Sequence, residues 1–374
     1  MRAEPILLAS PHLSRKGWER FHIKEALDKN WIAPVGENID RFEAELCAQI
    51  GSPNGVAVSS GTAAIHLGLK ALGVGAGDKV ICSTFTFAAS CNPICYENAE
   101  PIFVDSERDT WNMDPKALEE ALSKNPRVKA VILVHLYGIP AKIVEIKEIC
   151  QRYQVPLLED AAESLGSTYH NQMTGTFGQI GIYSFNGNKI ITTSGGGMLV
   201  TNNHDYAKKA KFWATQSREQ ELHYEHKELG YNYRMSNISA GIGRGQLRIL
   251  QDRVEKKRYI HQKYQELLSD IPEIGWLTEP KGTYSNYWLT CGIFDGIDQQ
   301  LVIQSLAEHQ IESRPLWKPM HLQPFFKKYG YHGEHVSDGL FATGMCFPSD
   351  TKMGDKDLDR VTDVIRRKVR QLRK

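Results

Sequence analysis

Lys189 stands between a short apolar run and three consecutive glycines, in the segment "SFNGNKIITTSGGGML". A lysine in this setting can be a solvated surface charge, a clamp for a phosphate, or a covalent catalyst. Lysine amines form Schiff bases with aldehydes, and burial lowers their pKa so that the neutral amine becomes available. The glycines lack a Cβ atom and allow a bulky group to approach the backbone. The segment alone is compatible with all three interpretations.

A second candidate site is the segment "SSGTAAIHL", where a strand-like stretch passes into an amphipathic helix. At such a helix start, the N–H groups of Gly61, Thr62 and Ala63 can point at an anion. An ordinary N-cap with a glycine turn explains the same residues. The segment is neither a P-loop nor a GxGxxG motif, because the lysine and the glycine spacing are missing.

Carboxylates mark a third place, in "VPLLEDAAESLG", where an apolar run ends on Glu159 and Asp160 and Glu163 follows. Such a carboxylate commonly caps the next helix. An ionised Asp160 can instead keep a heteroaromatic ring nitrogen protonated, and this role needs a cofactor. Pyridoxal phosphate would account for all three places together, with a phosphate cradle, a carboxylate for the ring nitrogen and a lysine for the aldehyde.

The fourth place, "HYEHKELGYNYRMSNISAG", interleaves aromatic residues with Asn232, Arg234 and Asn237. Tyr-rich polar stretches are often interface or turn material. An Asn and an Arg here can instead reach a phosphate or a substrate diphosphate.

The elements that must position these residues follow an α/β pattern. Apolar runs such as "DKVICSTFTF", "EPIFVD" and "VKAVILVHLYG" alternate with helical stretches such as "DPKALEEALSKN". This predicts a mainly parallel sheet covered on both faces, with ligands bound beyond the carboxyl ends of its strands. We expect a large α/β domain over 1–245 and a smaller α+β domain over 246–374, joined by one long helix over about 241–270.

Composition excludes several classes of protein. The chain has 374 residues and a formal net charge of +1, which argues against a nucleic-acid-binding surface. Its seven cysteines lack disulfide or metal spacing, so we expect free thiols and no metal site. No apolar run reaches the length of a signal peptide or a membrane span, which predicts a cytoplasmic protein without membrane insertion.

In order and spacing, four segments resemble the motifs of the DegT/StrS family of nucleotide-sugar aminotransferases: "SSGTAAIHLGL", "EDAAESLG", "SFNGNKIITTSGGGMLV" and "GYNYRMSNISAGIG". The resemblance implies the fold type I of pyridoxal phosphate-dependent transferases, like aspartate aminotransferase. Within the family, "ICYENAEPIFVD" and "ESRPLWKPMH" are most similar to the bacillosamine-pathway transaminases. Those enzymes aminate the C4 ketone of a UDP-linked 4-keto-6-deoxy-N-acetylhexosamine, which implies a role in surface polysaccharide biosynthesis.

The resemblance implies that Lys189 and Asp160 are catalytic, with Lys189 carrying pyridoxal 5′-phosphate and Asp160 on its ring nitrogen. Further cofactor contacts are implied for Gly61, Thr62, Ala63 and Ser184 at the phosphate, and for Phe87 and Glu163 at the ring. An acid such as Glu163 would repel a phenolate unless it is protonated or turned away. Asn232 would reach the phosphate of the neighbouring subunit, which predicts a homodimer with shared sites.

A nucleotide sugar is large and anionic, and Arg suits its diphosphate while Trp offers a stacking face. The candidate substrate contacts are Asn186, Arg218, Arg234, Arg314, Trp317 and His321. Packing within the small domain explains Trp317 and His321 equally well. The family usually has "CLPSG" and often "SNRWL" where this chain has "CFPSD" and "SNYWL", and the second difference puts Tyr287 at a basic position.

By analogy with the family, glutamate would donate the amino group and Lys189 would transfer the protons. The alternatives are a dTDP-linked or C3 keto sugar, a dehydratase of the same family and a non-catalytic regulator. Lys189 argues against the dehydratases, which carry His there, and the chain shows no added DNA-binding module. An NAD-dependent enzyme is disfavoured because the glycine fingerprint is missing.

Overall fold

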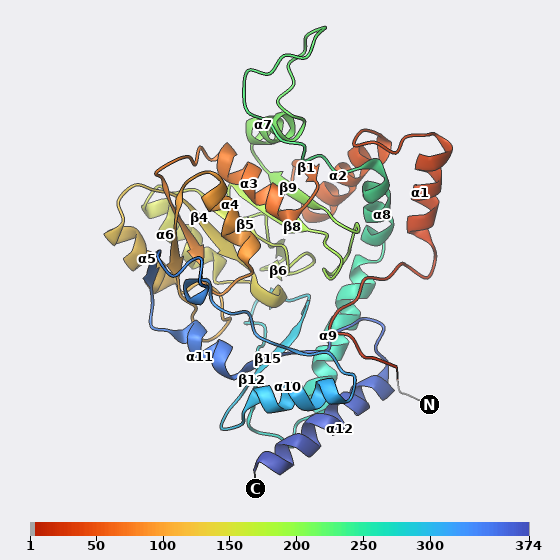
Figure 1. Cartoon of the computed structure of the whole chain (residues 1–374), viewed down its shortest axis with the longest axis vertical. Helices are drawn as coiled ribbons and strands as arrows, with labels where there is room; N and C mark the ends of the chain where they lie inside the picture. Colours follow the sequence, from red (N-terminus) through yellow and green to blue (C-terminus); the bar gives the residue numbers. More distant parts are fainter. Residues whose placement is uncertain (1–3, 374) are drawn as a thin grey trace.

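The computed structural model describes residues 4–373, and its centre is an eight-stranded sheet (Figure 1). In spatial order the strands are β1 (Asn54–Val58), β9 (Gly197–Thr201), β8 (Ile180–Ser184), β5 (Leu157–Asp160), β4 (Val128–Val134), β2 (Lys79–Ser83), β3 (Glu100–Val104) and β14 (Gly330–His332). Only β9 runs antiparallel to its neighbours. The predicted α/β fold with a mainly parallel sheet is confirmed.

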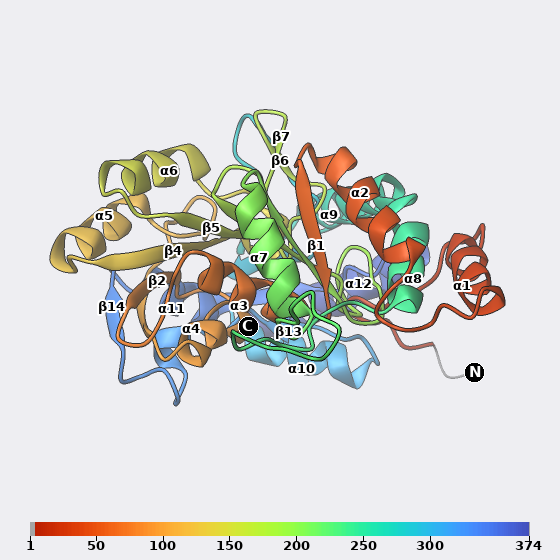
Figure 2. The ribbon, with the colours of Figure 1, turned by 90° about the horizontal axis from the view of Figure 1, so that it is seen from above.

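Helices cover both faces of this sheet, because its strands are apolar on both sides. In β4, Ile132 packs into one core with helices α3, α4 and α7, whereas Val131 and Leu133 pack into another with α5 and α6. Figure 2 shows α5 and α6 on one side of the sheet and α3 and α4 on the other. The bounds of these helices are Gly61–Ala71 for α3, Asn92–Tyr96 for α4, Pro115–Lys124 for α5, Ile143–Arg152 for α6 and His204–Ala214 for α7.

A second, antiparallel sheet lies in the C-terminal part of the chain. Its order is β10 (Ile274–Trp276), β12 (Thr290–Phe294), β15 (Gly344–Phe347) and β13 (Arg314–Pro315). A separate apolar core joins this sheet to α10 (Gln299–Glu308) and α12 (Asp355–Leu372), which carries Leu358, Val361 and Ile365 on its buried face. Further elements are α1 (Trp18–Asp28), α2 (Glu37–Ile50), α11 (Val336–Thr343), and the small sheet of β6 (Thr168–Tyr169), β7 (Gln172–Met173) and β11 (Thr283–Tyr284).

Two segments cross the division expected between residues 245 and 246. Strand β14 comes from the C-terminal part but pairs in parallel with β3 at the edge of the large sheet. The N-terminal segment, in turn, lies on the C-terminal part, where Ile6 forms a bridge with Ile311 and the N–H of Leu8 donates to Glu312. The two sheets are therefore held together by chain segments as well as by side-chain packing.

The connecting helix predicted over about 241–270 is corrected to two helices, α8 (Asn237–Leu247) and α9 (Leu250–Leu267). Ile249 leaves the helical region with φ −113° and ψ 14°. Helix α8 packs closely against α1 through Gly245, where an added Cβ would lie 2.5 Å from the N of Glu19. The break lets α9 turn away from α1 toward the second sheet, where Ile260 and Tyr264 enter its core.

All seven cysteines are free thiols. Of the helices described over residues 4–373, none combines the length and the apolar character needed to cross a membrane.

Candidate functional site

A cavity of about 330 Å³ lies where the large sheet ends in β5 and β8 and helix α3 begins. This is the carboxyl edge of the parallel strands, as expected for a ligand site in an open α/β sheet. Nine residues predicted from the sequence line it together: Gly61, Thr62, Phe87, Asp160, Glu163, Ser184, Asn186, Lys189 and Trp317. The fold thus brings residues far apart in the sequence into one space.

The start of helix α3 forms one wall of the cavity. The Oγ of Ser60 accepts a hydrogen bond of 3.0 Å from the N–H of Ala63 and caps the helix. The N–H of Ala63 already has the Oγ of Ser60 as its acceptor. The prediction that Ala63 contacts an anion is therefore corrected. Within residues 4–373, the N–H groups of Gly61 and Thr62 have no acceptor, so these two can hold an anion at the positive end of the helix.

Asp160 is buried at the end of β5 and faces the cavity. Its Oδ2 accepts a hydrogen bond of 2.6 Å from the hydroxyl of Ser90, and its Oδ1 accepts from the N–H of Ala162 at 3.1 Å. The hydroxyls of Ser90 and Thr86 lie 2.7 Å apart, which fixes Ser90 in turn. These bonds hold one orientation of a carboxylate that can pair with a cation in the cavity.

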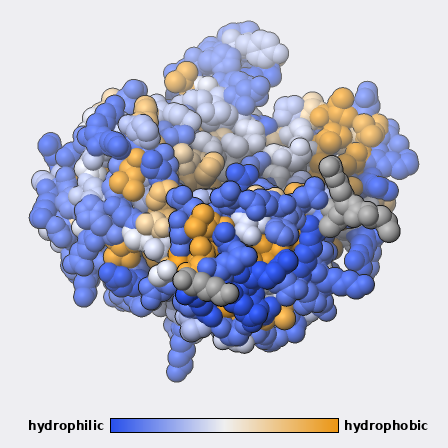
Figure 3. Space-filling view, turned by 60° about the horizontal axis from the view of Figure 1, so that its bottom comes forward, coloured by the Kyte–Doolittle hydropathy of each residue, from blue (hydrophilic) through white to orange (hydrophobic). Residues whose placement is uncertain are grey.

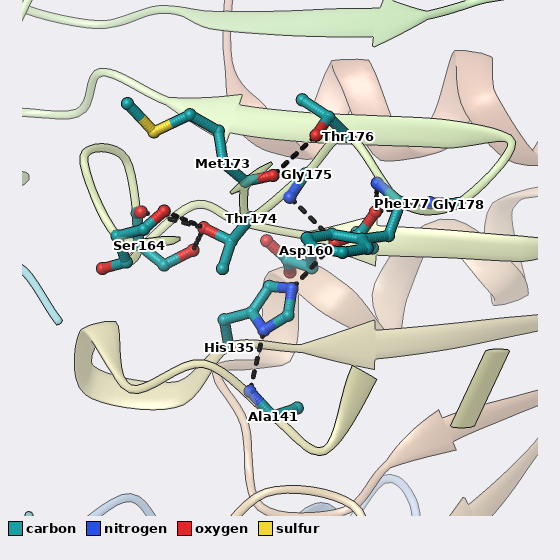
Figure 4. Close-up of polar contacts among 12 residues, drawn as sticks. His135, Ala141, Asp160, Ser164, Met173, Thr174, Gly175, Thr176, Phe177 and Gly178 are labelled. Carbon is teal, nitrogen blue, oxygen red and sulfur yellow. Dashed lines mark hydrogen bonds and ion pairs between the residues drawn. The ribbon is translucent and has the colours of Figure 1, made fainter. Parts of the chain in front are cut away.

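The neighbouring Glu159 points the other way, because alternate residues of a strand face opposite sides. Its carboxylate accepts from the N–H groups of Gly175, Phe177 and Gly178 at 2.6–2.8 Å. The fourth donor is Nε2 of His135 at 3.0 Å, since Nδ1 of this ring accepts from the N–H of Ala141 (Figure 4). Glu159 therefore holds the turn over residues 173–178 against β5.

Lys189 reaches the cavity from the loop after β8. Its Nζ lies 3.4 Å from Oε1 of Glu163 and 4.1 Å from the centre of the Trp288 ring. The Lys189 side chain is 12% exposed, so the amine is not a solvated surface charge. A lysine held between a carboxylate and an aromatic face, beside an anion cradle, is placed for reaction with a bound carbonyl.

Burial raises the pKa of Glu163, and the nearby charge of Lys189 opposes this shift. Its Oε2 accepts from the N–H of Tyr137 at 2.7 Å. Its Oε1 faces Lys189 and the Nε1 of Trp317, which lies 3.5 Å away. Burial thus opposes the ionisation of Glu163, which lessens the repulsion of an anionic oxygen placed beside it.

The three glycines after Lys189 differ in role, which corrects the expectation that all three make room for a ligand. An added Cβ on Gly196 would clash with Oγ1 of Thr193, and one on Gly197 would lie 2.5 Å from the N of Gly61. These two glycines are required by contacts within the chain. Only Gly195 borders free space, because its Cβ would meet nothing closer than an oxygen 4.0 Å away.

Two predicted substrate residues have partners outside the cavity. The side chain of Arg234 is 7% exposed and donates to Glu43 at 2.6 Å and to the carbonyl of Ala57 at 3.0 Å, so it holds α2 against β1. His321 lies with its Nδ1 2.7 Å from Oγ1 of Thr84 and its Nε2 3.0 Å from Asp338. Both side chains are occupied by the chain itself.

The other predicted contacts outside the cavity are exposed. Arg314 lines an adjoining cavity together with Trp288 and Trp317, and its guanidinium lies 3.0 Å from Glu312. Arg218 and Asn232 belong to the segment between α7 and α8, part of which projects from the body of the molecule (Figure 1). Asn232 forms a bridge with Thr215 next to the end of α7, and its Oδ1 accepts from Gln216. Arg218 and Asn232 do not reach the cavity of their own chain.

Sequence reasoning missed Ser90 and Trp288, which line the cavity beside Asp160 and Lys189. Ser90 lies in "TFAAS" three residues after Phe87, without a charge or spacing that would single it out. Trp288 lies in "SNYWL" about 100 residues from Lys189, and an apolar strand explains it equally well.

Comparison with known proteins is consistent with this geometry. Residues 16–366 match the model of the DegT/DnrJ/EryC1/StrS aminotransferase family. EpsN of Bacillus subtilis (strain 168), which carries the name of a pyridoxal phosphate-dependent aminotransferase, is 49% identical over 369 residues, covering 96% of this chain and 95% of that protein. GDP-perosamine synthase of Escherichia coli O157:H7 is 35% identical over 354 residues, covering 94% of this chain and 96% of that protein.

Among solved structures, the aminotransferase TlmJ from Streptoalloteichus hindustanus superimposes with a TM-score of 0.93 at 27% identity, covering 99% of this chain and all of that one.

Proposed function

Because the chain belongs to the DegT/DnrJ/EryC1/StrS aminotransferase family, we propose that it uses glutamate to aminate the C4 ketone of a UDP-linked 4-keto-6-deoxy-N-acetylhexosamine. It is a pyridoxal phosphate-dependent aminotransferase of nucleotide sugars. One observation carries the proposal. Lys189, Asp160 and the free N–H groups of Gly61 and Thr62 share a single cavity.

The residues of this cavity fit pyridoxal phosphate. The N–H groups of Gly61 and Thr62, with Ser184 beside them, would hold the phosphate. Asp160 would pair with the protonated ring nitrogen, and Lys189 would reach the aldehyde. When bound, the cofactor supplies an aldehyde that accepts the amino group and a ring that takes up electrons.

Lys189 is the base in this proposal. Its amine would take a proton from Cα of the amino donor and deliver it to the aldehyde carbon (C4′) of the bound cofactor, and in the second half of the reaction it would move a proton in the opposite direction. The hydroxyl of Ser90 and the N–H of Ala162 both donate to Asp160 and would hold its carboxylate toward the ring nitrogen. Glu163 would donate or share a proton at the cofactor's phenolic oxygen.

The sugar would enter from the open side of the cavity. Trp317 offers an apolar face there, which suits a 6-deoxy sugar, and Asn186 adds an amide for its polar groups. Arg314, which lines the adjoining cavity together with Trp317, would bind the diphosphate. A GDP-linked keto sugar is the second candidate, favoured by the relatives named GDP-perosamine synthase.

We further propose a homodimer with shared sites. Arg218 and Asn232 lie outside the cavity of their own chain, in the exposed segment between α7 and α8, which would contact a partner. Apolar surface gathers on the side of the molecule that carries α1 (Figure 3). Its exposed members are Phe21, Leu27, Trp31, Ile32 and Val35. A two-fold interface would cover such a surface and place this segment of each chain over the other site.

The test is a half-reaction followed by a substrate panel. The purified protein loaded with cofactor should lose its visible absorbance when glutamate is added, and should regain it with the UDP-linked keto sugar but not with GDP-linked or dTDP-linked ones. Lys189→Ala should abolish both changes, whereas Lys356→Ala, at an exposed position, should retain them. Recovery with the GDP-linked sugar alone would overturn the choice of nucleotide and leave the aminotransferase activity standing.

A further inference from the structure

Trp288 is the large buried side chain at the cavity that the proposed function leaves without a role. We propose that Trp288 is a positioning residue for Lys189, whose free ammonium it holds against the face of its indole ring beside Glu163. The inference rests on the proposed role of Lys189, but it concerns the chain's own residues and can be tested without cofactor.

The geometry is that of a cation–π contact. The Nζ of Lys189 lies 4.1 Å from the centre of the Trp288 ring and 3.4 Å from Oε1 of Glu163. Trp is the strongest partner for such a contact, and the attraction grows when the pair is removed from water. Trp288 is 2% exposed, so the contact between Lys189 and Trp288 is shielded from water. The amine therefore has two separate attractions that define its position when it is not engaged by a ligand.

Trp288 is itself fixed at three points. Its Nε1 donates at 2.7 Å to the carbonyl of Asn188, the residue next to Lys189. Its N–H donates at 2.8 Å to Oδ1 of Asn286, and its carbonyl accepts at 2.7 Å from Nζ of the buried Lys257. Turning the ring away from the lysine would break the buried Nε1 bond, and the other two bonds hold the backbone from which the ring extends.

The same segment also fixes Glu163, the other partner of Lys189. The Nδ2 of Asn286 donates to the backbone carbonyl of Glu163 at 3.0 Å and to that of Leu165 at 2.9 Å. Asn286 is thus bonded both to Trp288 and to the loop that carries Glu163. One short stretch of the C-terminal part sets the position of the aromatic face and of the carboxylate together.

Other charged groups face Lys189 and enter the test. Glu163 and Asp160 line the main cavity with it. On its other side, a small polar cavity is lined by His12, Arg253, Lys257 and Asp350 as well as by Lys189. All of these charged groups are present in a Trp288 variant as well. A difference in Lys189 reactivity between the variant and the wild type therefore reports the effect of the indole ring on Lys189.

The experiment measures acylation of Lys189 in cofactor-free protein, by quantitative mass spectrometry after brief exposure to acetic anhydride. Only the neutral amine reacts, so the ratio of the rate at pH 7.5 to that at pH 11 reports the protonation of Lys189, and changes in access cancel. For Trp288→Leu we expect this ratio to rise by about 2- to 30-fold, the factor that corresponds to a lost cation–π contact. Trp288→Phe keeps an aromatic face and should show a smaller rise.

Trp276→Leu removes a tryptophan packed against Tyr264 and Phe347, away from the cavity, and should leave the ratio unchanged. If Trp288→Leu does not fold, Trp288→Met fills the space without an aromatic face and serves in its place. An unchanged ratio in a folded Leu or Met variant overturns the proposal. Failure of the sugar-nucleotide assay would not move this ratio, so the two proposals fail separately.

Discussion

The Nζ of Lys189 lies 3.4 Å from Oε1 of Glu163, and both side chains are largely removed from solvent. Ion pairs of this kind are costly to bury, so one partner often gives up its charge. Burial raises the pKa of Glu163, which identifies the acid as the partner that tends to neutralise.

Glu163→Gln should therefore change how stability depends on pH. The folded protein holds the Glu163 proton more tightly than the unfolded chain, whose pKa is near 4.5. As pH rises from 4.5 through the raised pKa, the wild type loses stability, by at most about 1.4 kcal/mol per pH unit from this group. The variant has no such proton to lose. Its free energy of unfolding, relative to that of the wild type, should therefore rise as the pH approaches neutrality.

The measurement is denaturant unfolding of cofactor-free protein between pH 4.5 and 8. Glu145→Gln, at an exposed position, provides the matched control and should run parallel to the wild type. A constant difference between Glu163→Gln and the wild type across this range would contradict the assignment.

Asp160→Asn should lower turnover by about 100- to 1000-fold, because the amide cannot supply the charge that a protonated ring nitrogen needs. Ser90→Ala removes the hydroxyl that donates to Asp160 at 2.6 Å and should lower turnover only about tenfold. Steady-state kinetics measure both, with the exposed Ser123→Ala as control. Equal losses in Asp160→Asn and Ser90→Ala would show that orientation, and not charge, is what Asp160 provides.

Substitutions at two of the glycines after Lys189 should have different effects, one on cofactor binding and the other on stability. Gly195→Ala adds a methyl group that meets only free space, so the variant should keep wild-type stability while binding the cofactor more weakly. Gly197→Ala would put its Cβ 2.5 Å from the N of Gly61 and should lower stability by about 1–3 kcal/mol. Thermal unfolding and equilibrium titration with pyridoxal phosphate distinguish the two. A stable Gly197→Ala variant would show that β9 can move away from α3.

Chains carrying Lys189→Ala and chains carrying Asn232→Ala should restore activity when they are mixed. If Asn232 serves the partner's cavity, each mixed dimer holds one intact site, and random assortment gives about a quarter of the wild-type activity. Unfolding and refolding the chains together, followed by the glutamate half-reaction, makes the measurement. Mixing Lys189→Ala with Asp160→Asn is the control. Both residues line the cavity of the same chain, so no activity should return.

Much of the site could be predicted because its chemistry lies in short segments that follow apolar strands. The positions of Lys189, Asp160 and the start of α3 follow from local patterns, since parallel strands bring their carboxyl ends to one edge. Local patterns did not give the partners of Arg234 and Ala63. Glu43 lies almost 200 residues from Arg234, and whether Ser60 or a ligand takes the N–H of Ala63 depends on one side-chain rotamer.

The fold was predictable to a similar degree. Alternation of apolar runs and helices predicts the sheet and its layers, but it does not predict β14, a three-residue strand among polar and aromatic residues. Pairing of β14 with β3 is a long-range event that no local periodicity encodes. The break between α8 and α9 was hidden for a related reason, because Leu247 and Leu250 keep helical spacing across it.

The place of β14 also bears on how the protein can be made and divided. During synthesis, the edge of β3 stays open until residues 330–332 have left the ribosome, long after the other seven strands are complete. A gene fragment ending near residue 245 would encode the pocket's lysine and aspartate, yet leave that edge bare and omit Trp288. Dividing the chain at residue 245 would therefore separate β14 from the large sheet and Trp288 from the cavity that it lines.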